Sequence, residues 1–121
     1  MNNVIERRKL PRLEIKDRAA AVMSDSRFGI ILDISKGGLS FRYIESPEET
    51  ETISARQVSI THDDFILTDM PCKIVKDRYP IEEYSSLSSL TMYRCCLQFG
   101  ELAPNHKSHL DYFIANFTKQ P

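Results

Sequence analysis

The feature that most constrains the fold is a strand–turn–strand pattern between residues 28 and 44. Phe28–Ile34 is a nearly continuous apolar run, too short for a typical helix and rich in isoleucine. Gly37-Gly38 follows, and glycine adopts positive φ at little cost, so the chain can reverse there. Leu39–Ile44 then alternates apolar and polar residues, as a half-buried strand does. The sequence therefore predicts a β-hairpin.

The other periodic segments are also short and predict strands. Leu13–Val22 is predicted as a first strand with polar interruptions, followed by a turn at residues 25–27. Tyr79–Ser89 is polar and rich in serine, which favours an exposed loop. Further strands are predicted at 58–60, at 65–67 and 72–75 on either side of Pro71, and at 92–99.

Helical periodicity is found at the C-terminus. Leu110, Phe113, Ile114 and Phe117 recur at i, i+3, i+4 and i+7, with Asn105 as the expected N-cap after Pro104. The apolar stripe could bind a partner, but its period suits packing on the strands, which we favour. Short antiparallel strands followed by one helix predict a mainly all-β fold, a small β-barrel with the helix across an opening or edge.

Length and composition predict one soluble, folded domain over residues 1–121. Hydrophobic residues make up 41% and charged residues 27%, as in ordinary globular proteins. The first dozen residues are polar and charged, unlike a signal peptide, and no apolar run reaches the ~18 residues of a membrane span. Three cysteines suit a reducing compartment. We therefore expect a cytoplasmic protein without membrane insertion.

Charge is unevenly distributed along the chain, although the net charge is only −1. Residues 1–27 contain seven Lys or Arg and four acids, whereas residues 45–51 contain four Glu and no base. The N-terminal part is therefore the expected anion-binding side.

Arg7-Arg8-Lys9-Leu10-Pro11-Arg12 is a dense cationic cluster. The planar guanidinium of arginine matches phosphate oxygens and also stacks on a nucleobase. Pro11 disfavours a helical conformation at Leu10, so this segment is expected to be an extended or turning arm, and residues 1–12 are expected to be flexible. A solvated basic tail is the alternative interpretation.

Asp33 and Ser35 share strand parity and are expected to face the same side of their strand. A carboxylate accepts two hydrogen bonds, as the N1–H and N2–H₂ edge of guanine offers, and a hydroxyl can address other polar atoms. Gly37 and Gly38 would permit close approach of a ligand to the backbone. The alternative is that Asp33 and Ser35 only cap the hairpin turn.

Taken together, the two segments resemble a known family. Arg8-x-x-x-Arg12 followed by Asp33-x-Ser35-x-x-Gly38 resembles the PilZ domain family, the bacterial receptors for cyclic di-GMP. The resemblance covers roughly residues 6–118 and includes the neighbouring stretches 6–8, 37–41 and 97–99. Each motif is short, but the ordered pair is specific. Residues 77–90 are longer and more polar than the family needs, and could be a partner-binding insertion or a loop.

The resemblance implies a six-stranded antiparallel barrel at 13–99, an arginine arm at 1–12 and a helix at 105–118. Arg8 and Arg12 would contact phosphates and stack on guanine, while Asp33 and Ser35 would bind a guanine edge. Gly38 would keep the turn open for the ligand.

The residue before the first motif arginine is associated in the family with stacking on a second ligand molecule. Here this residue is Arg7, which favours an intercalated cyclic di-GMP dimer.

The expected function is a non-enzymatic cytoplasmic receptor without a cofactor. Its arm would close over cyclic di-GMP and alter a surface for a downstream protein that controls motility, biofilm or exopolysaccharide. One alternative is an interaction adaptor of the same fold that binds no nucleotide. Another is a single-stranded nucleic-acid binder, which the absence of Trp and of an aromatic residue beside the arginines disfavours.

Catalytic and metal-binding patterns are weak in this sequence. There is no Ser/His/Asp arrangement, paired carboxylate motif or phosphate-binding loop. His106 and His109 could share a helix face, with Cys72 nearby, but no metalloenzyme spacing supports zinc. Cys95 and Cys96 should face opposite sides of their strand, so they are expected to be structural thiols.

Overall fold

The structure is a computed structural model that describes residues 12–16, 18–25, 27–44, 56–80 and 92–119, with the backbone alone for 77–80. Its elements are, in chain order, β1 (Leu13–Glu14), β2 (Ala20–Met23), β3 (Phe28–Ser35), β4 (Gly38–Ile44), β5 (Gln57–His62), β6 (Phe65–Pro80), β7 (Met92–Phe99) and α2 (Pro104–Phe117).

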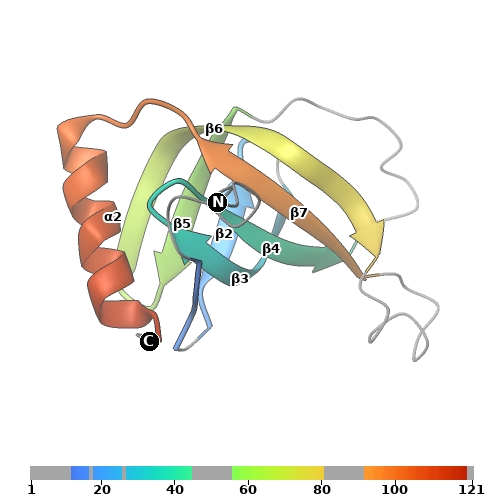
Figure 1. Ribbon diagram of the computed structural model, residues 1–121, viewed down its shortest axis with the longest axis horizontal. Coiled ribbons are helices and arrows are strands. Elements are labelled where there is room, and N and C mark those ends of the chain that lie inside the picture. The colour runs from blue at the N-terminus through green and yellow to red at the C-terminus, as the bar shows by residue number, and fades with distance from the viewer. Residues whose placement is uncertain (1–11, 17, 26, 45–55, 81–91, 120–121) are drawn as a thin grey trace, which may run out of the picture.

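Six of the strands form a closed antiparallel barrel. Neighbours follow the order β3, β2, β5, β6, β7 and β4, and a further pairing of β4 with β3 closes the ring. Each of these six strands therefore has two neighbouring strands, so the ring has no exposed sheet edge. Figure 1 shows the barrel with α2 standing beside one of its ends. The predicted fold class is confirmed.

The predicted first strand at Leu13–Val22 is divided into two strands. β1 pairs with Asp33 and Ile34 near the end of β3, whereas β2 pairs with Phe28–Ile30 near its start. Between these pairings, β3 carries an irregularity opposite β4, located between Ile31 and Asp33. A bulge bends a strand locally, so β1 and β2 follow the two halves of β3 separately.

The predicted hairpin of β3 and β4 is confirmed, but the reason given for its glycines was wrong. None of the glycines in the described residues has positive φ. Gly38 is instead required by close packing, since a Cβ there would lie 2.1 Å from the carbonyl oxygen of Leu97 on β7. Glycine at this position therefore allows β4 and β7 to approach each other.

β6 is one long strand where the sequence predicted two short ones around Pro71. Gln57 of β5 pairs with Pro71, and Phe99 of β7 pairs with the next residue, Cys72. Pro71 thus marks the point where β6 exchanges one neighbour for the other, a position that tolerates a missing N–H. Tyr79 and Pro80 belong to β6 rather than to the predicted loop, and residues 81–91 lie outside the described part.

Helix α2 packs on the barrel through the predicted apolar stripe. Leu110 and Phe113 are buried, and the Phe113 ring lies 5.3 Å from that of Phe65, measured between centroids. The N-cap is Ala103 rather than Asn105, because Pro104 takes the first helical position, where no N–H partner is needed.

The core fills the inside of the barrel and the contact with α2. Alternate residues of β7 point inward, so Cys95 is buried while its neighbour Cys96 is only partly so. This confirms the predicted opposite orientation of the two thiols. The largest fully buried side chains are Phe41, Phe113, Ile34, Leu39, Ile60, Met70, Leu97 and Leu110.

Candidate functional site

Strand pairing brings Arg12 of the first motif next to the second motif. Glu14 of β1 is paired with Asp33 of β3, which places Arg12, two residues before Glu14, beside the second motif. Arg12 Nη1 donates a hydrogen bond to Asp33 Oδ1 over 3.0 Å. The structure thus joins Arg12 and Asp33 at one point. Arg7 and Arg8, the other predicted arginines, lie outside the described residues.

The Asp33 carboxylate has three partners among the described residues. Besides Arg12, the hydroxyl of Ser40 donates to Oδ1 over 2.9 Å, and Arg94 Nη2 forms an ion pair with Oδ2 at 3.5 Å. Two guanidinium groups therefore share one carboxylate. The Asp33 side chain is 22% exposed, so a ligand can reach it.

Ser35 has a different environment from Asp33. Its side chain is buried, and its Oγ accepts a hydrogen bond from the backbone N–H of Gly37 over 3.1 Å. This bond closes the hairpin turn, so the turn-capping interpretation holds for Ser35. Asp33 does not cap the turn in this way, since its partners among the described residues lie outside the turn. Lys36, at the tip of the turn, points towards α2, with Nζ 3.7 Å from Asp111 Oδ1.

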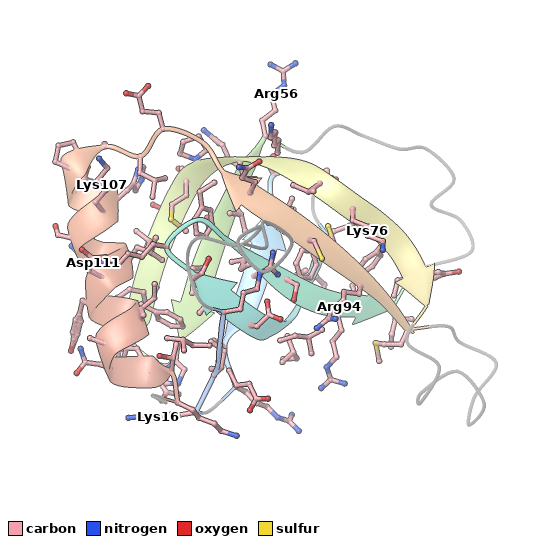
Figure 2. The ribbon with its side chains drawn as sticks, viewed as in Figure 1. Lys16, Arg56, Lys76, Arg94, Lys107 and Asp111 are labelled. Carbon is pink, nitrogen blue, oxygen red and sulfur yellow. The ribbon has the colours of Figure 1, made fainter. Side chains whose placement is uncertain are left out.

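Arg94 is a site residue that the sequence reasoning missed. Its position follows from the register of β4 on β7, in which Ser40 is opposite Cys96 and Arg42 is opposite Arg94. Strand parity indicates that Arg94 faces outward, but only the paired register shows that it reaches Asp33. In Figure 2, Arg94 and Lys76 lie on the half of the barrel away from α2.

A shallow depression of about 420 Å³ lies close to this site, between β1 and β2. Its wall includes Glu14, whose strand partner is Asp33, and the exposed Lys16 and Arg18. Ile30, Ile31 and Leu32 of β3 also line it. The lining of the depression therefore combines two cations and one carboxylate with an apolar stretch of β3.

The residues considered for a metal site do not come together. Within the described ranges, no group of three or more His, Cys, Asp or Glu could hold a metal ion. His106 Nε2 lies 3.0 Å from the carbonyl oxygen of Thr68 and so joins α2 to β6.

The Cys72 thiol ionises with difficulty. Burial, with a contribution from the negative charge of Asp25, raises the pKa of this thiol to about 11.

In the described part of the chain, no helix is both long and apolar enough to cross a membrane.

Comparisons with known proteins identify the fold. No protein-family model and no curated protein matches the sequence. The PilZ domain of YcgR from Escherichia coli, solved with c-di-GMP, superposes with a TM-score of 0.64 at 14% identity, over 90% of this chain and 89% of that one. The chain therefore has the fold of PilZ domains.

Two longer solved proteins show the same likeness. YcgR from Escherichia coli in complex with c-di-GMP has a TM-score of 0.61 at 15% identity, over 90% of this chain and 45% of that one. The MrkH–c-di-GMP complex of K. pneumonia has a TM-score of 0.62 at 12% identity, over 91% of this chain and 51% of that one. The chain thus spans about half the length of these two proteins.

Proposed function

We propose that this protein is a non-enzymatic receptor for cyclic di-GMP. The observation that carries the proposal is the contact of Arg12 with Asp33, because it joins the motif proposed to bind phosphate to the motif proposed to read the base at one partly exposed point. The solved proteins of the same fold were obtained with this nucleotide, which adds support. The proposed ligand-binding residues are Arg7, Arg8, Arg12, Asp33, Ser35 and Gly38.

In the proposed mechanism, Arg12 changes partner when the ligand binds. Its guanidinium donates a hydrogen bond to Asp33 Oδ1. A phosphate also accepts charge-assisted hydrogen bonds from a guanidinium and can do so in bidentate geometry, so Arg12 can transfer to the ligand with little loss. Asp33 Oδ1 then has an acceptor position available for one of the two donors, N1–H and N2–H₂, of the guanine edge. Arm and hairpin would thus close on one ligand from two sides.

The output of such a receptor would be a changed surface rather than a reaction. Ordering of the arginine arm costs conformational entropy, which charge-assisted bonds to the ligand offset. The ordered arm would then present a new face to a downstream protein. A bacterial, cytoplasmic receptor of this kind, which controls motility, biofilm or exopolysaccharide, is the role that we propose.

A second candidate is an interaction adaptor of the same fold that binds no nucleotide. The observation in its favour is that Ser35 and Gly38 each have a structural reason to be present. Ser35 closes the turn, and Gly38 allows β4 to approach β7. Neither residue therefore requires a ligand to explain it, whereas the Arg12–Asp33 contact is placed where a ligand can compete for it.

A titration separates these candidates. Cyclic di-GMP, GTP and a short single-stranded oligonucleotide are titrated in turn into the protein and its Arg12→Ala and Asp33→Ala variants by calorimetry. Cyclic di-GMP should bind saturably, and each variant should lose affinity by about 10- to 100-fold, the value of a hydrogen bond to a charged group. Lys36→Ala is the matched control, because Lys36 lies in the second motif but points towards Asp111.

Two outcomes would contradict the proposal. Absence of saturable binding of cyclic di-GMP by the unsubstituted protein would leave the adaptor as the better candidate. Tighter binding of the oligonucleotide than of cyclic di-GMP would favour a single-stranded nucleic-acid binder.

The same calorimetry tests the number of ligands. We propose an intercalated cyclic di-GMP dimer, with Arg7 stacked on the second molecule, so the expected stoichiometry is two per chain. Arg7→Ala should reduce it to one and leave the first binding step in place. A stoichiometry of one in the unsubstituted protein would rule out the ligand dimer but would leave the receptor proposal unaffected.

A further inference from the structure

We propose that Arg94 is a specificity-determining residue of the ligand site, which positions the Asp33 carboxylate for guanine when Arg12 transfers to phosphate. This inference rests on the proposed function. Neither of the two sequence motifs includes Arg94. The contact that carries the inference is the ion pair of Arg94 Nη2 with Asp33 Oδ2 at 3.5 Å.

The first argument is the number of acceptor positions on Asp33. A carboxylate has about four lone-pair positions, two on each oxygen. Arg12 and Ser40 both donate to Oδ1, whereas Arg94 approaches Oδ2. Departure of Arg12 leaves one lone-pair position free on Oδ1. Oδ2 has one lone-pair position in addition to the one that faces Arg94. Two neighbouring acceptors, one on each oxygen, match the two donors of the guanine edge.

The second argument is that Arg94 stays in place while Arg12 moves. Arg94 belongs to β7, which is paired with β4 on one side and with β6 on the other. Arg12 precedes the two-residue strand β1, whose sheet partner is β3. After Arg12 has left, Ser40 alone would hold the carboxylate at Oδ1, and the group could rotate about that bond. Arg94 holds the second oxygen and so fixes the carboxylate plane.

The consequence is discrimination between guanine and adenine. The adenine edge presents an acceptor at N1 where guanine presents a donor, so a fixed carboxylate binds guanine and repels adenine. A site built to pair with a particular donor rejects an analogue that lacks it more strongly than an apolar pocket can. A carboxylate free to rotate would lose part of this discrimination, while phosphate contacts from the arm would be retained.

The test compares the affinities for cyclic di-GMP and cyclic di-AMP in Arg94→Gln, Arg94→Lys and Arg42→Gln, measured by calorimetry. Arg42 is the matched control, because it is the strand partner of Arg94, whereas the described ion pairs of Asp33 are with Arg12 and Arg94. Arg94→Gln should lower the affinity for cyclic di-GMP by about tenfold and leave that for cyclic di-AMP unchanged. Arg94→Lys should restore part of the preference, and Arg42→Gln should keep all of it.

The outcomes separate this inference from the proposed function. If the unsubstituted protein binds cyclic di-GMP and Arg94→Gln keeps the same preference for guanine, the role of Arg94 is overturned and the receptor proposal stands. An equal loss for both nucleotides would also overturn it, since that is the effect expected of a phosphate contact such as Arg12. If the unsubstituted protein does not bind cyclic di-GMP, both proposals fall. Thermal melts of each variant show whether the fold is intact.

Discussion

Arg12 and Asp33 form a hydrogen-bonded ion pair in which both side chains remain partly exposed, at 23% and 22%. Ion pairs in contact with solvent contribute only about 0–1 kcal/mol to stability, because water competes for both charges. The pair can therefore bring the two motifs together without strongly opposing a ligand that takes its place. Stability and ligand affinity should respond differently to substitution at this site.

The Ser35 hydroxyl should matter for stability as well as for ligand binding. Ser35→Ala removes the acceptor of the Gly37 N–H and should lower the free energy of unfolding by about 1 kcal/mol, as measured by urea denaturation. Ser59→Ala is the matched control, because Ser59 Oγ accepts from the Asp69 N–H over 3.0 Å on another hairpin. Both variants should lose similar stability, and only Ser35→Ala should weaken cyclic di-GMP binding. Equal affinities in the two variants would assign Ser35 to the turn alone.

Gly38→Ala should destabilise the barrel even in the absence of ligand. The added Cβ would lie 2.1 Å from the Leu97 carbonyl oxygen, which belongs to the backbone and cannot rotate away. Overpacking of this kind costs about 1–3 kcal/mol or more, and a lower thermal midpoint would show it. Gly100→Ala is the control, because its nearest contact is a Pro71 side-chain atom at 3.3 Å. A Gly38→Ala variant as stable as the Gly100→Ala variant would contradict the close approach of β4 to β7.

Phe113 should be the main anchor of α2. It is fully buried, and Phe113→Ala should reduce the free energy of unfolding by about 3–5 kcal/mol in denaturant titrations. Tyr112, the preceding residue, is 49% exposed and stacks on Phe65 with ring centroids 6.0 Å apart. Tyr112→Ala should therefore cost only about 1 kcal/mol. Similar losses in the two variants would mean that α2 does not dock through the face that the structure shows.

Cys72 should react slowly with alkylating reagents at pH 8. Burial, assisted by the charge of Asp25, raises the pKa of its thiol from 9.0 to about 11, so little reactive thiolate is present. Iodoacetamide labelling followed by mass spectrometry should show a rate at Cys72 that increases with pH up to about 11, and Asp25→Asn should increase the rate at pH 8. A rate at Cys72 that stops increasing near pH 9 would contradict the raised pKa.

The same raised pKa makes stability depend on pH in alkaline solution. The unfolded thiol ionises near pH 9, before the folded one, so the contribution of Cys72 is complete below pH 9 and is lost as the pH rises towards 11. Cys72→Ala should lessen this decline in denaturation midpoints measured across that range.

Local sequence patterns predicted the hairpin and the helix because their causes are local. The apolar run of β3, the alternation of β4 and the spacing of Leu110 and Phe113 each lie within a dozen residues. The long strand β6 was divided in the prediction, because Pro71 normally interrupts a strand. Only the exchange of neighbours from β5 to β7 makes proline acceptable there.

The candidate site was predictable only in part, because its motifs are local but some of its contacts join residues far apart in the sequence. The two motifs can be read as short patterns, and the structure places Arg12 against Asp33. Arg94 has no pattern of its own, because its contact with Asp33 depends on the register of strands far apart in the sequence. The contact of Ser40 with Asp33 likewise follows from the pairing of β3 with β4.

The short segment that follows Arg12 also joins the start of the domain to the end of α2. Lys16 N–H donates to the Phe117 carbonyl over 2.8 Å, Lys119 N–H donates to the Glu14 carbonyl over 2.7 Å, and Ile15 is bridged antiparallel to Thr118. Residues 12 and 119 lie at the same end of this antiparallel pairing. Tension applied between them would therefore break these hydrogen bonds one after another instead of all at once. Residues 14–16 would therefore separate from the end of α2 at low force.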